Sequence, residues 1–439
     1  MSNITASGDK RDRNATGMNR RRFLAATGAG AVMTTVAGCA GRGGDDDVFR
    51  IGHIAPTTDP MGIGSERSAE IAVDQIDEIL DQEVELLTGD TEGEVDEAES
   101  DIETMIVEDN IDLLVGTFVT EVTQGNMDFV AQRDVPFIIT GSADTETVVD
   151  YHGEDYETYK NIFRTGPINS SLQAESVVEY AEFLADEHGW TSFGLLRDDA
   201  AWTVPFGDEI PGLFEETDLS LDYETAADIE TDDFSSYYDS FESEGVDVVL
   251  RIAAHANGAN LVSTWQGEYD FAMEGIHVTS MSPEFWDQTN GACLYESTGQ
   301  AGAGGVTEMS EGDETMSFVE AYQEEYGDEE PSMPMYMGFN TYDAINFYKE
   351  AVEDAGTADY DNDLDDIVDA MLSLTYDGTA GEISLYGEDG EYPHDVQEVR
   401  DEDGRIVNFP FTQWQEGGEV ECVFPETYAT ADHQAPDWM

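Results

Sequence analysis

Short apolar runs alternate with longer amphipathic segments along the chain from residue 48 onward. Residues 48–54 are rich in β-branched and aromatic side chains, which predicts a buried strand. After a turn-forming loop, Ile71, Ala72 and Ile76 recur at the spacing of one helix face. Because strands that alternate with helices form parallel sheets covered on both faces, this pattern predicts an α/β fold.

The same alternation returns later, with a helix expected over 170–187 and strands over 193–196, 246–250 and 276–279. A chain of 439 residues is too long for one ordinary core and suggests two or three domains. Parallel α/β sheets bind ligands beyond the carboxyl ends of their strands. We therefore expect functional side chains in the post-strand segments 55–64, 116–120, 140–144, 197–202, 252–255 and 280–284.

Acidic residues dominate the composition. The chain carries 98 acidic and 17 basic residues, a net charge of −81. The acidic residues are not confined to one tail but run from Asp45 to Asp437, interleaved with apolar residues. Such a chain repels nucleic acid and anionic lipid, so both are excluded as electrostatic partners. Molar salt shortens the Debye length to about 3 Å and screens the self-repulsion. We interpret the acidic residues as the solvated surface of a halophilic protein.

The first 47 residues indicate an export signal and a tether. Arg20-Arg21-Arg22 precedes an apolar stretch that is too short for a transmembrane helix. The arginine pair resembles a twin-arginine signal, and residues 36–39 resemble a lipoprotein processing box that ends in Cys39. We expect a signal peptide over 1–38, a lipidated Cys39 and a flexible tether over 39–47. The protein would then be lipid-anchored on the outer face of the cytoplasmic membrane.

The chain lacks the signatures of common catalytic and cofactor sites. It has no dinucleotide-binding glycine motif, no P-loop lysine motif and no nucleophile elbow, and its seven histidines are scattered. The acidic run 359–363 is followed by Leu364, where a calcium loop needs glycine. We therefore expect no enzyme activity, no cofactor and no metal site.

Several short segments, in their order and spacing, resemble a known family. They include residues 50–56, 111–116, 135–140 and 161–167. Together they are similar to the leucine-isoleucine-valine binding proteins, the type I periplasmic binding proteins that serve ABC importers. The resemblance implies two doubly wound parallel-sheet lobes, joined by a hinge, with a ligand cleft between them. The implied lobes are 48–166 plus 298–390 for lobe one, and 167–297 plus 391–439 for lobe two.

The resemblance also implies ligand contacts from lobe one. Thr120 falls where the family sets a hydroxyl on the ligand carboxylate. Ser142, Ala143 and Asp144 follow the next strand, where the family uses backbone groups and a hydroxyl. Asp144 departs from that pattern, and its carboxylate suits an ammonium or amide donor. Three of these residues also have a structural alternative, since Thr120 can cap a helix, and Ser142 and Asp144 can be turn residues.

From lobe two, Trp202 falls at the position of the family's aromatic clamp, with a core aromatic as the alternative. His255 or Ala254 falls at another aromatic position. Glu284 is a candidate partner for a ligand ammonium, with Met281 as the alternative at that position.

Two cysteines remain besides Cys39. Pairing is permitted outside the cytoplasm, and we expect a Cys293–Cys422 disulfide, with two buried free thiols as the alternative.

The function expected from the resemblance is that of a receptor that delivers a small polar ligand to the permease subunits of an ABC importer. A branched-chain or other amino acid is the first candidate ligand. A short amide or urea is the second, because of Asp144. A sensory ligand-binding protein that works with a signalling receptor is a third possibility.

Overall fold

The structure, a computed structural model, describes residues 48–255 and 257–439. The expectations for the signal peptide, for Cys39 and for the tether fall outside these residues. Among the described helices none is long and apolar enough to cross a membrane. No group of three or more His, Cys, Asp or Glu side chains within the described ranges could hold a metal ion.

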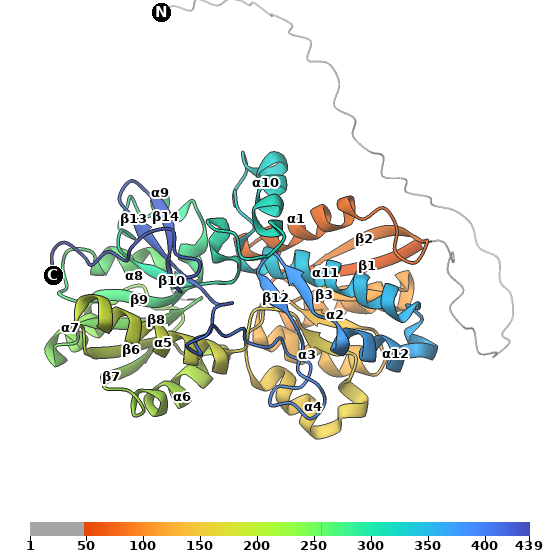
Figure 1. Ribbon diagram of the computed structural model, residues 1–439, viewed down its shortest axis with the longest axis horizontal. Coiled ribbons are helices and arrows are strands. Elements are labelled where there is room, and N and C mark those ends of the chain that lie inside the picture. Colours follow the sequence, from red (N-terminus) through yellow and green to blue (C-terminus); the bar gives the residue numbers. More distant parts are fainter. Residues whose placement is uncertain (1–47, 256) are drawn as a thin grey trace, which may run out of the picture. The chain divides into compact units, whose positions relative to one another are not determined.

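The first sheet contains five parallel strands in the order β2–β1–β3–β4–β5. Figure 1 labels β1, β2 and β3 of this sheet. Strands β3, β4 and β5 are wholly buried, as apolar runs are in a parallel sheet that is covered on both faces. The strands are β1 (Val48–Ala55), β2 (Glu83–Asp90), β3 (Leu113–Gly116), β4 (Phe137–Ile139) and β5 (Ile162–Arg164).

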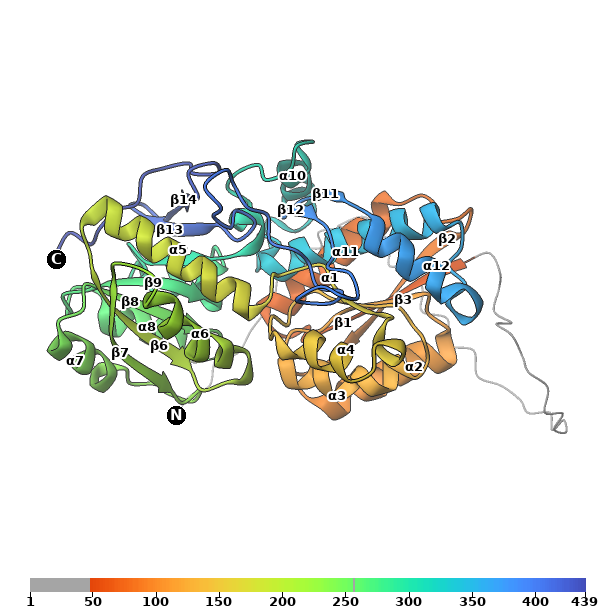
Figure 2. The ribbon, with the colours of Figure 1, turned by 60° about the horizontal axis from the view of Figure 1, so that its bottom comes forward.

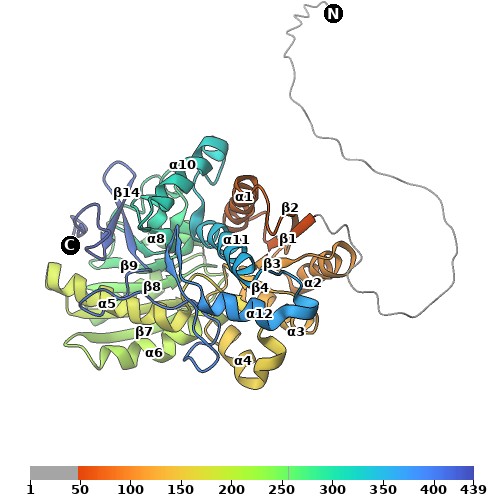
Figure 3. The ribbon, with the colours of Figure 1, turned by 45° about the vertical axis from the view of Figure 1, so that its right-hand side comes forward.

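Helices from two distant parts of the chain cover this sheet. Figure 2 shows α2, α3 and α4 on one side of it and α11 and α12 on the other. Helix α1 packs against α11 (Figure 3). The helices are α1 (Pro60–Gln75), α2 (Val95–Thr104) with its π-helical extension η1 (Met105–Asp109), α3 (Thr120–Ala131), α4 (Glu146–Tyr159), α10 (Glu314–Tyr326), α11 (Met335–Ala355) and α12 (Tyr360–Ser373).

The second sheet contains four parallel strands in the order β7–β6–β8–β9. They are β6 (Ser192–Asp198), β7 (Ser220–Ala227), β8 (Val248–Ala253) and β9 (Ala272–His277). Their helices are α5 (Ser170–His188), α6 (Val204–Phe214), α7 (Ser235–Glu244), α8 (Gly258–Trp265) and α9 (Phe285–Gln288).

Two small antiparallel sheets complete the described chain. Strand β10 (Ser297–Gly299) contacts β9 and pairs with β13 (Phe411–Gln415), which pairs with β14 (Glu419–Phe424). Strands β11 (Tyr376–Gly378) and β12 (Gly381–Ile383) form a hairpin. The α/β fold with parallel sheets and covering helices is confirmed.

The expected Cys293–Cys422 disulfide is wrong, because both residues are buried free thiols. Cys293 lies in an apolar cluster with Phe285 and Trp414, and its sulfur accepts a hydrogen bond from Thr289. Cys422 lies in a separate cluster with Ala303 and Met309. Burial raises the pKa of each thiol to about 12, so both stay protonated and unreactive at neutral pH.

Candidate functional site

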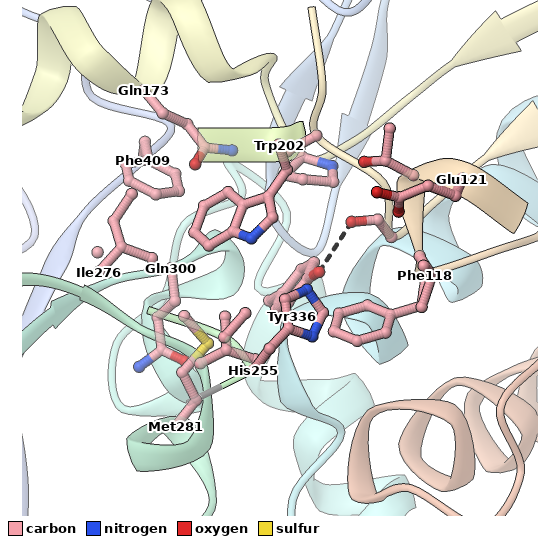
Figure 4. A pocket seen from close by; sticks show the side chains of 18 residues that line it. Phe118, Glu121, Gln173, Trp202, His255, Ile276, Met281, Gln300, Tyr336 and Phe409 are labelled. Atoms are coloured by element: carbon pink, nitrogen blue, oxygen red, sulfur yellow. Dashed lines mark hydrogen bonds between the residues drawn. The ribbon is translucent and has the colours of Figure 1, made fainter. Parts of the chain in front are cut away.

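A cavity of about 50 Å³ lies where the carboxyl ends of strands from both sheets meet (Figure 4). From the first sheet, residues 118–121 follow β3, and Gly141 and Ala143 follow β4. From the second sheet, Trp202 follows β6, and residues 254–255 follow β8. With Met281 from the segment 280–284, five of the expected post-strand segments reach one cavity, at the edge where parallel α/β sheets bind ligands.

Two hydroxyl groups lie together at the first-sheet end of the cavity. Thr120 Oγ1 and Ser142 Oγ form a hydrogen bond of 3.2 Å, and both side chains are buried. Thr120 is the first residue of α3, whose start has no side-chain cap. The helix-capping alternative for Thr120 is therefore not observed. Thr120 lines the cavity. Ser142 contacts Thr120 but does not line the cavity itself.

The loops on the two sides of the cavity meet at the start of α5. The Ser170 N–H donates to the carbonyl oxygen of Ala143 at 2.7 Å. The Ser170 hydroxyl lies 2.9 Å from both that oxygen and the carbonyl oxygen of Trp202. The positions of the two cavity loops are thus linked through a single residue.

A buried arginine holds the 142–144 loop from behind. Arg164 Nη1 donates to the carbonyl oxygens of Ser142 at 3.0 Å and Asp144 at 2.9 Å. Its Nε and Nη2 donate to the two carboxylate oxygens of Asp395, at 2.7 and 2.5 Å. Asn169 also donates to Asp395 at 3.0 Å. Sequence reasoning assigned no role to Arg164, although a lone arginine at the end of an apolar strand was a visible signal.

Asp144, expected at the ligand, does not line the cavity. Its carboxylate accepts hydrogen bonds from the Thr147 N–H at 3.0 Å, from the Thr147 hydroxyl at 2.9 Å and from Gln124 at 3.2 Å. Burial raises the pKa of Asp144, and the Thr147 hydrogen bond and the Arg164 charge oppose that rise. The carboxylate therefore stabilises the start of α4, the turn role that was its alternative.

Glu284 also lies outside the lining. Its carboxylate accepts from the Ser282 hydroxyl at 2.6 Å and from the Ser332 N–H at 3.1 Å. Burial raises its pKa, but these hydrogen bonds outweigh burial, so that the pKa is lowered overall and the group is ionised. Met281, the alternative at this position, does line the cavity.

Aromatic rings from distant segments form the middle of the cavity wall. Trp202 and His255, both expected at the site, lie here with Tyr336 (Figure 4). The centroid of the Phe118 ring lies 6.2 Å from the ring centroid of His255 and 6.5 Å from that of Tyr336. Tyr336 donates its hydroxyl proton to the Gly141 carbonyl oxygen at 2.8 Å, and burial raises its pKa. Sequence reasoning covered Phe118 only as part of the segment 116–120. It missed Tyr336, which belongs to a helix that no local pattern connects to the cavity.

A family model described as periplasmic binding protein matches residues 48–405. The chain belongs to this family. No curated protein sequence is significantly similar to it.

Solved structures resemble this periplasmic binding protein in fold. One described as a branched-chain amino acid ABC transporter from Silicibacter pomeroyi is 19% identical, with a TM-score of 0.76, over 90% of this chain and 100% of the other. A solute binding protein of an ABC transporter from Rhodopseudomonas palustris BisB5, in complex with 3,4-dihydroxybenzoic acid, is 18% identical, with a TM-score of 0.68. That match covers 89% of this chain and 99% of the other. The branched-chain amino acid transporter substrate binding protein from Streptococcus pneumoniae, in complex with isoleucine, is 16% identical, with a TM-score of 0.66. That match covers 86% of this chain and 100% of the other. At these identities the likeness shows the fold and not the ligand.

The cavity of this periplasmic binding protein has few charged groups. Among the described residues, no arginine or lysine lines it, and Glu121 is its one carboxylate. Glu121 is exposed. The other polar side chains that the described residues bring to the lining are Thr120, Gln173, His255, Gln300 and Tyr336, with the indole of Trp202. The remaining wall is largely apolar and aromatic.

Proposed function

We propose that this periplasmic binding protein is the extracytoplasmic receptor of an ABC importer. Its two lobes, 48–166 with 298–390 and 167–297 with 391–439, would close on a small ligand that lies between the two sheets. Family membership and the position of the cavity at the strand ends of both sheets support this role. No reaction is required, because the ligand's preference for the closed state supplies the free energy of closure.

The ligand we propose is a small monocarboxylate with an apolar or aromatic body. The observation that carries this proposal is the Thr120–Ser142 hydroxyl pair at the start of α3, next to an aromatic wall. A helix start presents N–H groups without intrahelical acceptors and favours a negative charge, so that a carboxylate can bind there without a basic side chain. The body of the ligand would then pack on Trp202 and Phe118.

An amino acid, branched-chain or other, is the second candidate. Glu121 lines the cavity and could accept a ligand ammonium, which favours this candidate. Two observations weigh against it: Glu121 is exposed, and the carboxylates of Asp144 and Glu284 are occupied by other donors. The amide or urea alternative rested on Asp144 and loses support for the same reason. The known ligands of structural neighbours, isoleucine and 3,4-dihydroxybenzoic acid, span both candidate classes.

Thermal unfolding in molar salt with matched ligands tests this proposal. We expect 4-methylpentanoate, which is leucine without its ammonium group, and benzoate to stabilise the protein. Leucinamide, which lacks the carboxylate, should not. A ligand at 100 times its dissociation constant adds about 2.7 kcal/mol to the free energy of unfolding. Stabilisation by leucine alone would instead identify an amino acid receptor, and stabilisation by none of these compounds would refute the proposed ligand class.

Thr120→Val supplies the control for the carboxylate site. Loss of a hydroxyl that pairs with a charged ligand group costs about 1.5–3 kcal/mol, roughly a ten- to hundredfold loss of affinity. The unfolding temperature without ligand should change little, because valine keeps the shape of the side chain. Unchanged affinity for benzoate would place the carboxylate elsewhere.

We also propose export by a twin-arginine signal and lipid anchoring through Cys39. Support comes from the order of arginine pair, apolar stretch and terminal cysteine over residues 20–39. Cys39→Ser should release the protein into the medium or leave its signal uncleaved, and lysines at Arg21 and Arg22 should block export. Cell fractionation measures both effects, with Arg13→Lys as a control outside the motif. Wild-type processing and retention in both variants would contradict the proposal.

A further inference from the structure

The second-sheet end of the cavity differs in chemistry from the end that holds Thr120. Figure 4 shows Gln173, Gln300, Ile276, Met281 and Phe409 on one side and Phe118 and Glu121 on the other, with Trp202 between them. The first group contains no ionisable side chain, and its polar atoms belong to two amides. A ligand that reaches both ends meets the proposed carboxylate site at Thr120 and a neutral end at Gln300.

Gln300 brings an unpaired acceptor to this neutral end. The residue directly follows β10 and is 2% exposed. Its Nε2 donates to Thr412 Oγ1 at 2.7 Å, whereas its Oε1 is buried and has no hydrogen-bond partner. Buried polar atoms in folded proteins nearly always have a partner, and those that lack one call for an explanation.

The orientation of the Gln300 amide follows from its neighbour. The Thr412 hydroxyl donates to the carbonyl oxygen of Thr298 at 3.4 Å. Since a hydroxyl has only one proton, Thr412 must accept from Gln300, and Gln300 must present its nitrogen to Thr412. The atom left for the cavity is therefore the carbonyl oxygen, a pure acceptor.

Trp202 adds a second unpaired atom to the lining. Its indole Nε1 is buried without a partner, while the ring packs edge-on against Phe206 with 5.6 Å between the centroids. Indole N–H is a donor only, so that it needs an oxygen or another acceptor. The cavity thus presents one unpaired acceptor and one unpaired donor, both uncharged.

We propose that the physiological ligand carries a hydroxyl group at the end opposite its carboxylate, and that this hydroxyl donates to Gln300 Oε1. The proposal rests on the proposed function, because it takes the carboxylate to lie at Thr120. A second carboxylate is disfavoured at Gln300, since the free atom there is an acceptor and, among the described residues, no arginine or lysine lies in the lining. An ammonium is disfavoured too, because none of the described residues brings a carboxylate to that end. Hydroxylated aromatic monocarboxylates satisfy both ends and the aromatic wall.

Calorimetric titration of the full-length protein in molar salt, with two matched pairs of acids, tests the proposal. The pairs are 4-hydroxybenzoate with benzoate, and 3-(4-hydroxyphenyl)propanoate with 3-phenylpropanoate. We expect the hydroxylated member of at least one pair to bind tenfold or more tightly, because a site that hydrogen-bonds a ligand hydroxyl rejects the analogue that lacks it. In Gln300→Met the preference should fall below about threefold, with affinity for the unhydroxylated acid retained.

The outcomes separate this inference from the proposed function. If the acids bind but hydroxylated and parent acids differ by less than threefold in the wild type, the inference is overturned and the carboxylate site stands. An unchanged hydroxyl preference in Gln300→Met also overturns it, because the hydroxyl is then recognised elsewhere. If no acid binds, the proposed ligand class fails and this inference fails with it. The wild-type comparison decides even where the variant does not fold.

Discussion

Below about 0.5 M salt we expect the protein to lose its cooperative unfolding transition. The net charge is −81, and the Debye length grows from about 3 Å at 1 M to about 10 Å at 0.1 M. At the longer Debye length, repulsion among neighbouring surface carboxylates is no longer screened, and this repulsion destabilises the compact state. This is the largest effect we predict, because it acts on every face of the protein at once.

The ion pairs of the structure show why internal pairing cannot offset this charge. Lys160 forms ion pairs with two carboxylates, those of Glu157 at 3.0 Å and Asp365 at 2.6 Å. Arg400 likewise lies within 2.7–3.5 Å of three glutamates. With 17 basic residues for 98 acidic ones, most carboxylates have only solvent cations to neutralise them.

Circular dichroism during heating, in a sodium chloride series at fixed pH, measures the salt effect. Sucrose is the control, since it strengthens burial by exclusion from the surface but screens no charge. We expect sucrose alone not to restore the transition at low salt. A sharp two-state transition in 20 mM buffer would show that the acidic surface is tolerated without screening.

The second large effect is expected for Arg164→Met, which should lower the free energy of unfolding by about 3–5 kcal/mol. Arg164 and Asp395 are both fully buried, so removal of the arginine leaves a carboxylate without its counter-charge in the interior. The carbonyl oxygens of Ser142 and Asp144 lose a donor at the same time. Because Ser142 contacts Thr120, ligand affinity should fall as well.

Two further variants show whether the stability effect arises from the buried charge. The double variant Arg164→Met with Asp395→Leu removes both charges and should recover part of the lost stability. Arg400→Met is the surface control: the side chains of Arg400 and its partner Glu175 are 32% and 36% exposed, and loss of a solvent-accessible pair costs about 1 kcal/mol or less. Urea unfolding in molar salt measures all three, because urea leaves the ionic strength unchanged. A double variant no more stable than Arg164→Met would refute the buried-charge explanation.

Local sequence patterns determined the secondary structure and the edge of the sheets where the site lies. The run over 48–54 became β1, and that over 246–250 fell largely within β8, since an apolar run in a parallel sheet is buried on both faces. The positions of Thr120 and Trp202 followed from the same logic, because post-strand loops gather at one edge. Asp144 also had a local signal, three residues before Thr147 at the start of a helix.

Only the tertiary structure decided which distant residues complete the cavity and which charges pair inside the fold. Tyr336 and Gln300 reach the lining because the chain returns to both sheets late in the sequence, and no periodicity encodes that return. The packing of distant segments likewise decides that Arg164 pairs with Asp395 and that Cys293 and Cys422 do not form a disulfide. Periodicity reports which face of an element is buried, whereas contacts between distant segments depend on how the elements pack.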